Sequence, residues 1–251
     1  MKARFILLAA LFAPPAAARA GAYDDLAGGA PREMSVPAAS PAGAVRQAAL
    51  PDESVAEDLP SAPEVLALAP ICKSVPPEFN FDPRGVIPAG LRGEAYEQYR
   101  ARYGQFGNTR YLAVIDFSQY SGKARFYIAD TEQGTVKVYH VAHGSGSDPD
   151  HDGYATIFSN KPDSNSSSLG LYLTGETYYG KHGKSMRLHG LSDTNSNAYA
   201  RAVVIHAADY VSDSDVKPGR SWGCPAVSAA SLPEVLSQLD GGALIYAGLS
   251  R

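Results

Sequence analysis

Alternating hydrophobic and polar positions dominate the second half of the chain and predict short β-strands. Residues 111–117 alternate with a period of two, and similar stretches follow. Turn signals at Ser121-Gly122 and Gln133-Gly134 separate the first stretches, which predicts an antiparallel meander with short connections. Further strands are expected around 126–128 and 136–138, and at 154–158, 171–174, 186–191, 203–207 and 243–247.

Two short helices are predicted between these strands. Residues 91–103 carry tyrosines at helical spacing. Ser231, Pro233 and Glu234 form the pattern of a capping box with proline in the first turn, which predicts a helix over 232–239. Because strands dominate and do not alternate regularly with helices, a doubly wound parallel sheet is disfavoured. The expected fold is mainly β, a β-sandwich or open barrel with a few short helices.

The N-terminal part of the chain differs in composition from the rest. Residues 1–20 have a basic start, an apolar run too short to span a bilayer and a small-x-small site, as in a cleaved signal peptide. Residues 21–70 are rich in Ala and Pro and carry a net charge of −6, which predicts a disordered tether. Residues 71–251 are therefore expected to form the folded domain, with no further stretch long enough to span a membrane.

Charge and residue spacing exclude several classes of function. The chain has a net charge of −4, whereas nucleic-acid-binding proteins usually show a clustered basic excess. Three histidines, His140, His143 and His151, lack the spacing of a zinc site, and no cofactor motif is present. The stretch 148–153 begins like a calcium loop but has Ser159 where the bidentate acid belongs, which favours an acidic surface turn.

The stretch with the clearest chemistry is a histidine followed by a cysteine on a glycine turn. His206 ends a β-branched run, and Cys224 lies between Gly223 and Pro225. An imidazole beside a thiol can accept its proton, and the resulting ion pair lowers the pKa of the thiol. The N–H groups of Gly223 and Cys224 are candidates for an oxyanion hole, and Ser221 is a candidate for orienting the turn.

These residues resemble the catalytic signature of the L,D-transpeptidase (YkuD-type) family. Ile205-His206-Ala207-Ala208 followed by Ser221-Trp222-Gly223-Cys224 is similar to the family's histidine and its Ser/Thr-His-Gly-Cys motif. The likeness is closest to the subgroup with Gly-Arg-Ser-x-Gly-Cys-Pro-Ala and extends over most of 105–250. The sequence departs from the family at Trp222, where a second histidine is usual, and at Ala226, where many members carry Arg or Asn.

The resemblance implies a YkuD-like β-fold and peptidoglycan chemistry in the periplasm or cell envelope. Cys224 would attack the carbonyl after the L-centre of a diamino acid in a tetrapeptide stem and expel the terminal D-Ala. The thioester would then pass to an amine of another stem, which gives a 3→3 cross-link. Carbapenems would be expected to acylate the same cysteine. Candidate substrate-binding residues in this interpretation are Arg187, His189, Arg220 and Trp222.

Two other interpretations remain open from the sequence. Water could replace the acceptor amine, which would make the protein an L,D-carboxypeptidase or an endopeptidase on the same scaffold. Alternatively, because two cysteines in an exported chain commonly pair, a Cys72–Cys224 disulfide would indicate a non-catalytic wall-binding domain.

Overall fold

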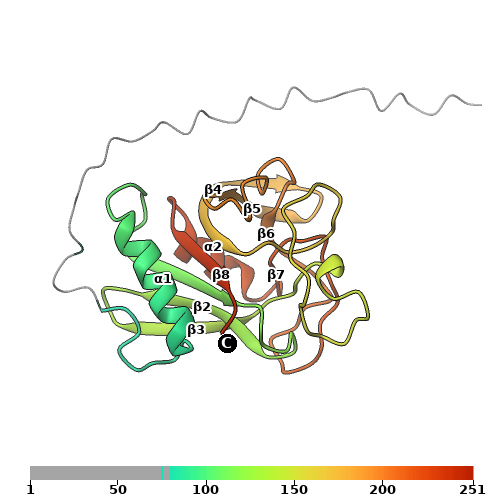
Figure 1. Cartoon of the computed structure of the whole chain (residues 1–251), viewed down its shortest axis with the longest axis horizontal. Helices are drawn as coiled ribbons and strands as arrows, with labels where there is room; N and C mark the ends of the chain where they lie inside the picture. The colour runs from blue at the N-terminus through green and yellow to red at the C-terminus, as the bar shows by residue number, and fades with distance from the viewer. Residues whose placement is uncertain (1–74, 76–79, 251) are drawn as a thin grey trace, which may run out of the picture. The chain divides into compact units, whose positions relative to one another are not determined.

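The computed structural model describes residue 75 and residues 80–250 as a curled eight-stranded sheet with two α-helices (Figure 1). The elements are α1 (Ala89–Ala101), β1 (Tyr111–Asp116), β2 (Ala124–Asp130), β3 (Thr135–His140), the 3₁₀ helix η1 (Ser145–Ser147), β4 (Gly170–Gly180), β5 (Gly183–Gly190), β6 (Val204–Ala207), β7 (Ala226–Val227), α2 (Leu232–Leu239) and β8 (Leu244–Gly248). The predicted signal peptide, the tether and Cys72 lie outside the described residues. Within the described part, no helix has the length and apolar character needed to cross a bilayer.

The sheet has the order β3-β2-β1-β8-β4-β5-β6-β7. Its neighbours are antiparallel except for the pairs β1–β8 and β6–β7, which are parallel. Beyond β3 the chain continues to the other edge, where Ala142 bridges Ala226 and Gly144 bridges Ser221. The sheet therefore nearly closes on itself, which confirms the predicted open barrel.

Both faces of the central strands are buried, so the side chains at alternate positions of each strand pack into two separate cores. Ala113 and Ile115 of β1 face the larger core, which also contains the apolar side of α2. Leu112 and Val114 face a second core beneath α1, which lies across the outer face of the sheet (Figure 1). β1 is thus paired with a strand on each side, and each of its faces packs in a core, as is usual for the buried strands of a layered fold.

The predicted elements agree with the structure except in three places. The stretch 154–158 is not a strand, because Thr156 and Ile157 both donate their N–H groups to the carbonyl of Ser147 in an irregular loop. The strand expected at 171–174 continues to Gly180 and forms a hairpin with β5. The two-residue strand β7 has no counterpart in the alternation pattern, since it is too short to show a period.

The helix predicted at 232–239 is confirmed, but its capping box does not form. Ser231 donates its hydroxyl to Asp213 at 2.9 Å instead of capping the helix. Glu234 forms an ion pair with Lys137 of β3. Tertiary partners therefore replace the local hydrogen bonds that the sequence pattern predicts.

A buried charge network supports the seam where the sheet closes. The Arg125 side chain of β2 is 0% exposed and donates to the carbonyl of Gln119 at 2.6 Å and to that of Val141 at 3.2 Å. Its Nη2 also donates to Nδ1 of His143 at 2.8 Å, so His143 carries its proton on Nε2 and donates to Asp148 at 3.1 Å. Burial lowers the pKa of Arg125 to about 9, and the nearby carboxylates of Asp116 and Asp148 oppose the shift. The guanidinium is therefore still charged at neutral pH.

Replacing Arg125 by Met should destabilise the domain by about 3 kcal/mol, because it leaves the Val141 carbonyl, His143 and Asp148 without their buried donor or counter-charge. Urea unfolding at pH 7 measures this loss. The matched control is Arg110→Met, which removes a pair with Asp130 in which the arginine is 40% exposed. The destabilisation in that control should be much smaller, because solvent screens an exposed ion pair. Equal losses in the two variants would contradict a structural role for the buried network.

Candidate functional site

The cysteine turn immediately precedes β7 and is closed by its own serine. Ser221 donates its hydroxyl to the carbonyl of Cys224 at 2.7 Å and accepts the N–H of Gly223 at 3.1 Å. Gly223 has a φ of +115°, and a Cβ at this position would lie 2.7 Å from the carbonyl oxygen of Ser166. Only glycine fits both the conformation and the space, so the residue before Cys224 is fixed by packing.

The predicted oxyanion hole differs from the observed hydrogen bonding. The Gly223 N–H is directed to the Ser221 hydroxyl and is not free to bind a substrate oxygen. Over residues 80–250, the Cys224 N–H has no acceptor and remains available. The sequence alone does not predict this hydrogen bond, because it depends on the conformation of the turn, which places the Ser221 hydroxyl beside the Gly223 N–H.

His206 lies near the end of β6, between β5 and β7. It is paired with Ser185 of β5 and, in parallel register, with Ala226 of β7. Because Ala226 is two residues after Cys224, this register places the imidazole beside the cysteine turn. Nδ1 of His206 lies 2.9 Å from the carbonyl of Ala207. A carbonyl only accepts, so Nδ1 carries the proton in this contact and Nε2 keeps its lone pair.

Cys224 and His206 line one cleft with a volume of about 360 Å³. Of the other predicted site residues, Ser221, Arg220 and Trp222 also line it, and Trp222 is 78% exposed. The cleft is completed by Tyr178, Lys181, His182, Arg201, Ala202, Val204 and Tyr210. Its walls therefore carry lysine, arginine and histidine side chains and no carboxylate, although the whole chain has a net charge of −4.

The thiol is held by the backbone that leads into β6. The Val204 N–H donates to Sγ of Cys224 at 3.5 Å, and Sγ lies 3.7 Å from the carbonyl of Ala202, which can accept its proton. Ala202 has a φ of +53°, a conformation that non-glycine residues rarely adopt. Among the described residues no hydrogen bond joins the thiol to His206.

The protonation states differ from the ion pair that the sequence predicts. Burial raises the pKa of the Cys224 thiol, and the Val204 N–H and the charge of Arg201 oppose this shift without reversing it. Burial also lowers the pKa of His206; the Ala207 carbonyl opposes this, and His182 lowers it further. The resting site therefore holds a neutral thiol and a neutral imidazole.

Two predicted substrate-binding residues do not line the cleft. The guanidinium of Arg187 lies over the rings of Tyr178 and Tyr199, at 4.5 and 5.2 Å from their centroids, and pairs with Glu176 at 3.0 Å. The ring of His189 stacks on Tyr199 at 4.8 Å. Both residues therefore pack within the β4–β5 hairpin and against Tyr199.

Arg201 and His182 line the cleft but have no recognisable local signal in the sequence. Arg201 donates to the carbonyls of Ser159 at 2.8 Å and Ser166 at 2.6 Å, which ties the loop of these two serines to the segment that precedes β6. His182 lies at the tip of the β4–β5 hairpin. Sequence spacing points to neither residue, because each reaches the cleft through tertiary packing.

Cys224 carries a free thiol in the structure. Its possible disulfide partner, Cys72, lies outside the described residues.

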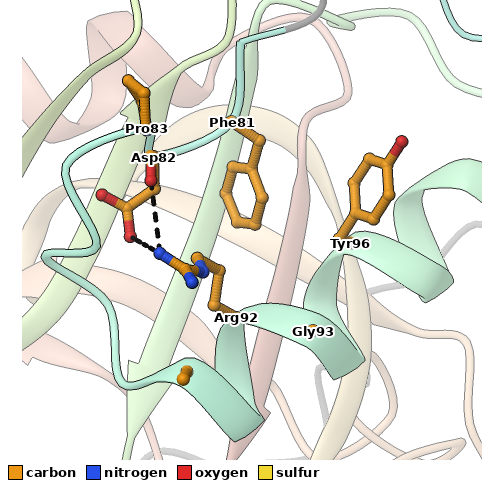
Figure 2. A pocket seen from close by; sticks show the side chains of 7 residues that line it. Phe81, Asp82, Pro83, Arg92, Gly93 and Tyr96 are labelled. Atoms are coloured by element: carbon orange, nitrogen blue, oxygen red, sulfur yellow. Dashed lines mark hydrogen bonds and ion pairs between the residues drawn. The ribbon is translucent and has the colours of Figure 1, made fainter.

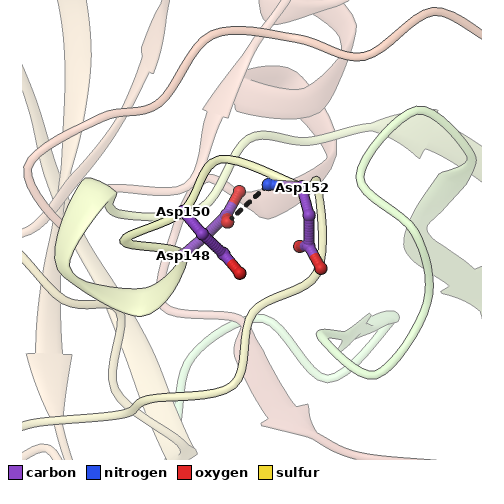
Figure 3. A group of neighbouring side chains, drawn as sticks. All are labelled: Asp148, Asp150 and Asp152. Carbon is purple, nitrogen blue, oxygen red and sulfur yellow. Dashed lines mark hydrogen bonds between the residues drawn. The ribbon is translucent and has the colours of Figure 1, made fainter.

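Figure 3 shows the three aspartates of the acidic loop at 148–153, which is joined to the seam by the hydrogen bond from His143 to Asp148. Oxygen atoms of Asp148, Asp150 and Asp152 lie within 4.8 Å of one another. Asp148 is fully buried and accepts hydrogen bonds from His143 and from the N–H groups of Asp152 and Gly153, whereas Asp150 and Asp152 are exposed. The predicted acidic surface turn is thus correct for Asp150 and Asp152 and wrong for Asp148, which serves the buried network.

A second hollow, of about 460 Å³, lies at the start of α1 (Figure 2). Both carboxylate oxygens of Asp82 are engaged by the N–H groups of Val86 and Ile87 at 2.8 Å, and Arg92 pairs with the same carboxylate at 3.5 Å. The residues lining this hollow include no cysteine and no histidine. It therefore lacks the nucleophile and base that the cleft at Cys224 provides.

One protein family matches most of the described part of the chain. Residues 89–247 match the model of the L,D-transpeptidase catalytic domain family. The chain belongs to this family. No curated protein matches it.

Solved L,D-transpeptidases are similar at low sequence identity. The Xylanimonas cellulosilytica enzyme has 14% identity, with 55% of this chain and 60% of that chain covered and a TM-score of 0.34. The Mycobacterium smegmatis L,D-transpeptidase has 13% identity, with 55% and 58% covered and a TM-score of 0.35. The L,D-transpeptidase LdtMt1 in complex with imipenem has 12% identity, with 55% and 59% covered and a TM-score of 0.35. The match therefore spans about three fifths of each of these chains.

His143 should make the stability of this L,D-transpeptidase domain depend on pH. Burial and then the Arg125 guanidinium lower its pKa from 6.5 to about 4, and Asp148 opposes this. Between these two pH values the unfolded chain binds a proton that the folded domain does not, so stability is lost as the pH falls. The free energy of unfolding should decrease by about 3 kcal/mol from pH 6.5 to 4 because of this group.

Urea unfolding at a series of pH values measures this dependence. His143→Gln cannot titrate, so its unfolding free energy should vary less over the same pH window. An unchanged slope in that variant would show that other groups cause the acid sensitivity.

Proposed function

We propose that the protein is a cysteine L,D-transpeptidase that acts on peptidoglycan stem peptides through a thioester. The observation that supports this most directly is that Cys224 and His206 line one cleft, with Nε2 of His206 unprotonated. A nucleophile and a free general base are the two groups that an acyl transfer through cysteine requires.

In the first half-reaction, the thiol proton of Cys224 passes to Nε2 of His206, and Sγ attacks the carbonyl after the L-centre of the stem's diamino acid. An S–C bond forms, and the Cys224 N–H stabilises the oxyanion. The bond to the terminal D-Ala then breaks, and His206 returns the proton to the leaving amine. In the second half-reaction an acceptor amine attacks the thioester, gives its proton to His206, and Sγ leaves and recovers that proton.

Proton transfer requires the S–H bond of Cys224 to rotate from the Ala202 carbonyl towards His206, while Sγ stays in place. The thiolate that results keeps the Val204 N–H as a donor and lies in the field of Arg201, both of which favour its negative charge. Arg201 thus contributes to nucleophile formation through charge, and it is held for this by the carbonyls of Ser159 and Ser166.

The walls of the cleft are suited to an anionic acyl donor. Lys181, Arg201 and Arg220 lie around the cysteine, and no carboxylate lines the cleft to repel a negatively charged substrate. Carboxylates of a stem peptide would interact favourably with these side chains. Arg220 is also fixed in place, because it donates to the carbonyl of Asp148.

We further propose that the protein acts in the periplasm or cell envelope after cleavage of a signal peptide over residues 1–20. The Ala/Pro-rich composition of residues 21–70 would give the catalytic domain reach along a fixed polymer. Both segments lie outside the described residues.

Incubating the purified protein with tetrapeptide muropeptides tests the proposed activity. Cross-linked dimers with release of D-Ala would support transfer, and release of D-Ala without dimers would indicate a carboxypeptidase with water as acceptor. Cys224→Ala should abolish both products while the thermal melting curve stays nearly unchanged.

Incubation with a carbapenem followed by mass spectrometry tests the nucleophile independently of the substrate. One adduct should form on Cys224 and should disappear in Cys224→Ala. The matched control is Cys72→Ser, which should still form the adduct. If no thiol reacts until the protein is reduced, the disulfide interpretation holds and the proposed mechanism is wrong.

Ser221→Ala should lower kcat by about 10- to 100-fold, because it releases the Cys224 carbonyl and the Gly223 N–H that the serine holds together. Ser221→Thr keeps the hydroxyl and should recover most of the rate. The control is Ser212→Ala, since Ser212 bonds only to the exposed Ser214 in the described structure. Full activity in Ser221→Ala would show that the turn does not need this closure.

A further inference from the structure

The tip of the β4–β5 hairpin carries a second imidazole into the cleft. Gly180 pairs with Gly183, so Lys181 and His182 form a two-residue turn between the strands. Gly183 has a φ of +73°, which permits the tight reversal. The ring of His182 lies against that of His206, with centroids 4.4 Å apart and planes tilted by 30°.

This contact explains why His206 is buried although it lines an open cleft. His206 is 3% exposed, whereas His182 is exposed. The His182 ring covers one face of the His206 ring, and the hydrogen bond from Nδ1 to Ala207 restrains its edge. The two contacts together define the plane of the imidazole and hence the direction of Nε2.

The cysteine turn itself provides no second imidazole, because Trp222 stands before Gly223. Among the residues lining the cleft, the only histidine besides His206 is His182. Any effect of a neighbouring imidazole on the base must therefore come from the hairpin.

We propose that His182 is a positioning residue for His206: its ring shields the His206 imidazole from solvent and fixes the plane in which Nε2 accepts the cysteine proton. This inference rests on the proposed role of His206 as general base.

The charges around His206 agree with this role. The other titratable or charged groups that line the cleft are Tyr178, Lys181, Arg201, Tyr210, Arg220 and Cys224. Of these surroundings, only the charge of His182 acts on the His206 imidazole, and it disfavours a proton there. Burial lowers the pKa of His206 first, and the charge of His182 adds to the effect.

Two substitutions separate stacking from charge. His182→Phe keeps an aromatic ring on His206 but removes the titratable group, whereas His182→Ala removes both. The control is Lys184→Ala, an exposed residue of the same hairpin that does not line the cleft. Thermal melting curves of all three variants check that the hairpin remains folded.

The first measurement is an NMR titration of the His206 imidazole, which requires no substrate. The pKa of His206 should increase in the order wild type, His182→Phe, His182→Ala, and Lys184→Ala should match wild type. An unchanged pKa in both His182 variants would overturn the proposal. Because the titration does not depend on turnover, it separates a failure of this inference from a failure of the proposed transpeptidase activity.

The second measurement is the pH profile of kcat/KM with the muropeptide donor. Its acid limb should move to higher pH in both variants, with kcat/KM at pH 5.5 about tenfold lower in His182→Ala and less reduced in His182→Phe. KM should change little, because His182 acts through His206. If His182→Phe shows the same His206 pKa and the same loss of kcat/KM at pH 5.5 as His182→Ala, the stacking part of the proposal is excluded.

Discussion

The buried guanidinium of Arg125 holds the segment at which the curled sheet closes, and the cysteine turn is hydrogen-bonded to the same segment. Arg125 is stable in the interior only if its donors find acceptors, and it finds them in the carbonyls of Gln119 and Val141 and in the His143 ring. The same segment carries the His143 carbonyl, which accepts the Ser221 N–H, while the Ser145 N–H donates to the Ser221 carbonyl. The backbone that leads into the cysteine turn is therefore attached to the segment that bonds the buried guanidinium.

Strand register fixes the position of His206 relative to the cysteine turn. His206 pairs with Ser185 on one side and Ala226 on the other, so its position is set by two neighbours at once. Because side chains alternate between the faces of a strand, a slip of one residue would move the imidazole to the opposite face. The distance in sequence between His206 and Cys224 matters less than this register, which the parallel β6–β7 pair fixes.

Local sequence patterns predicted most strands, both helices and the cysteine–histidine pair, because alternation and turn residues act over a few positions. They failed where another group competes for the hydrogen bond that the pattern predicts. Ser231 binds Asp213 instead of capping α2, and the Gly223 N–H turns to Ser221 instead of a substrate. Arg201 and His182 reach the cleft only through tertiary packing, and Arg187, which the resemblance associated with substrate, is held by two tyrosines.

The neutral resting pair changes how the site must work. An ion pair prepared in advance would keep a reactive thiolate in an open cleft, where it would also react with oxidants and other electrophiles. Here burial favours the thiol, and the Ala202 carbonyl is placed to accept its proton, while burial and then His182 lower the pKa of His206. Proton transfer then becomes favourable only when a carbonyl carbon is present to accept the electron pair of the sulfur. Under the proposed mechanism, formation of the nucleophile and attack on the substrate are thereby coupled.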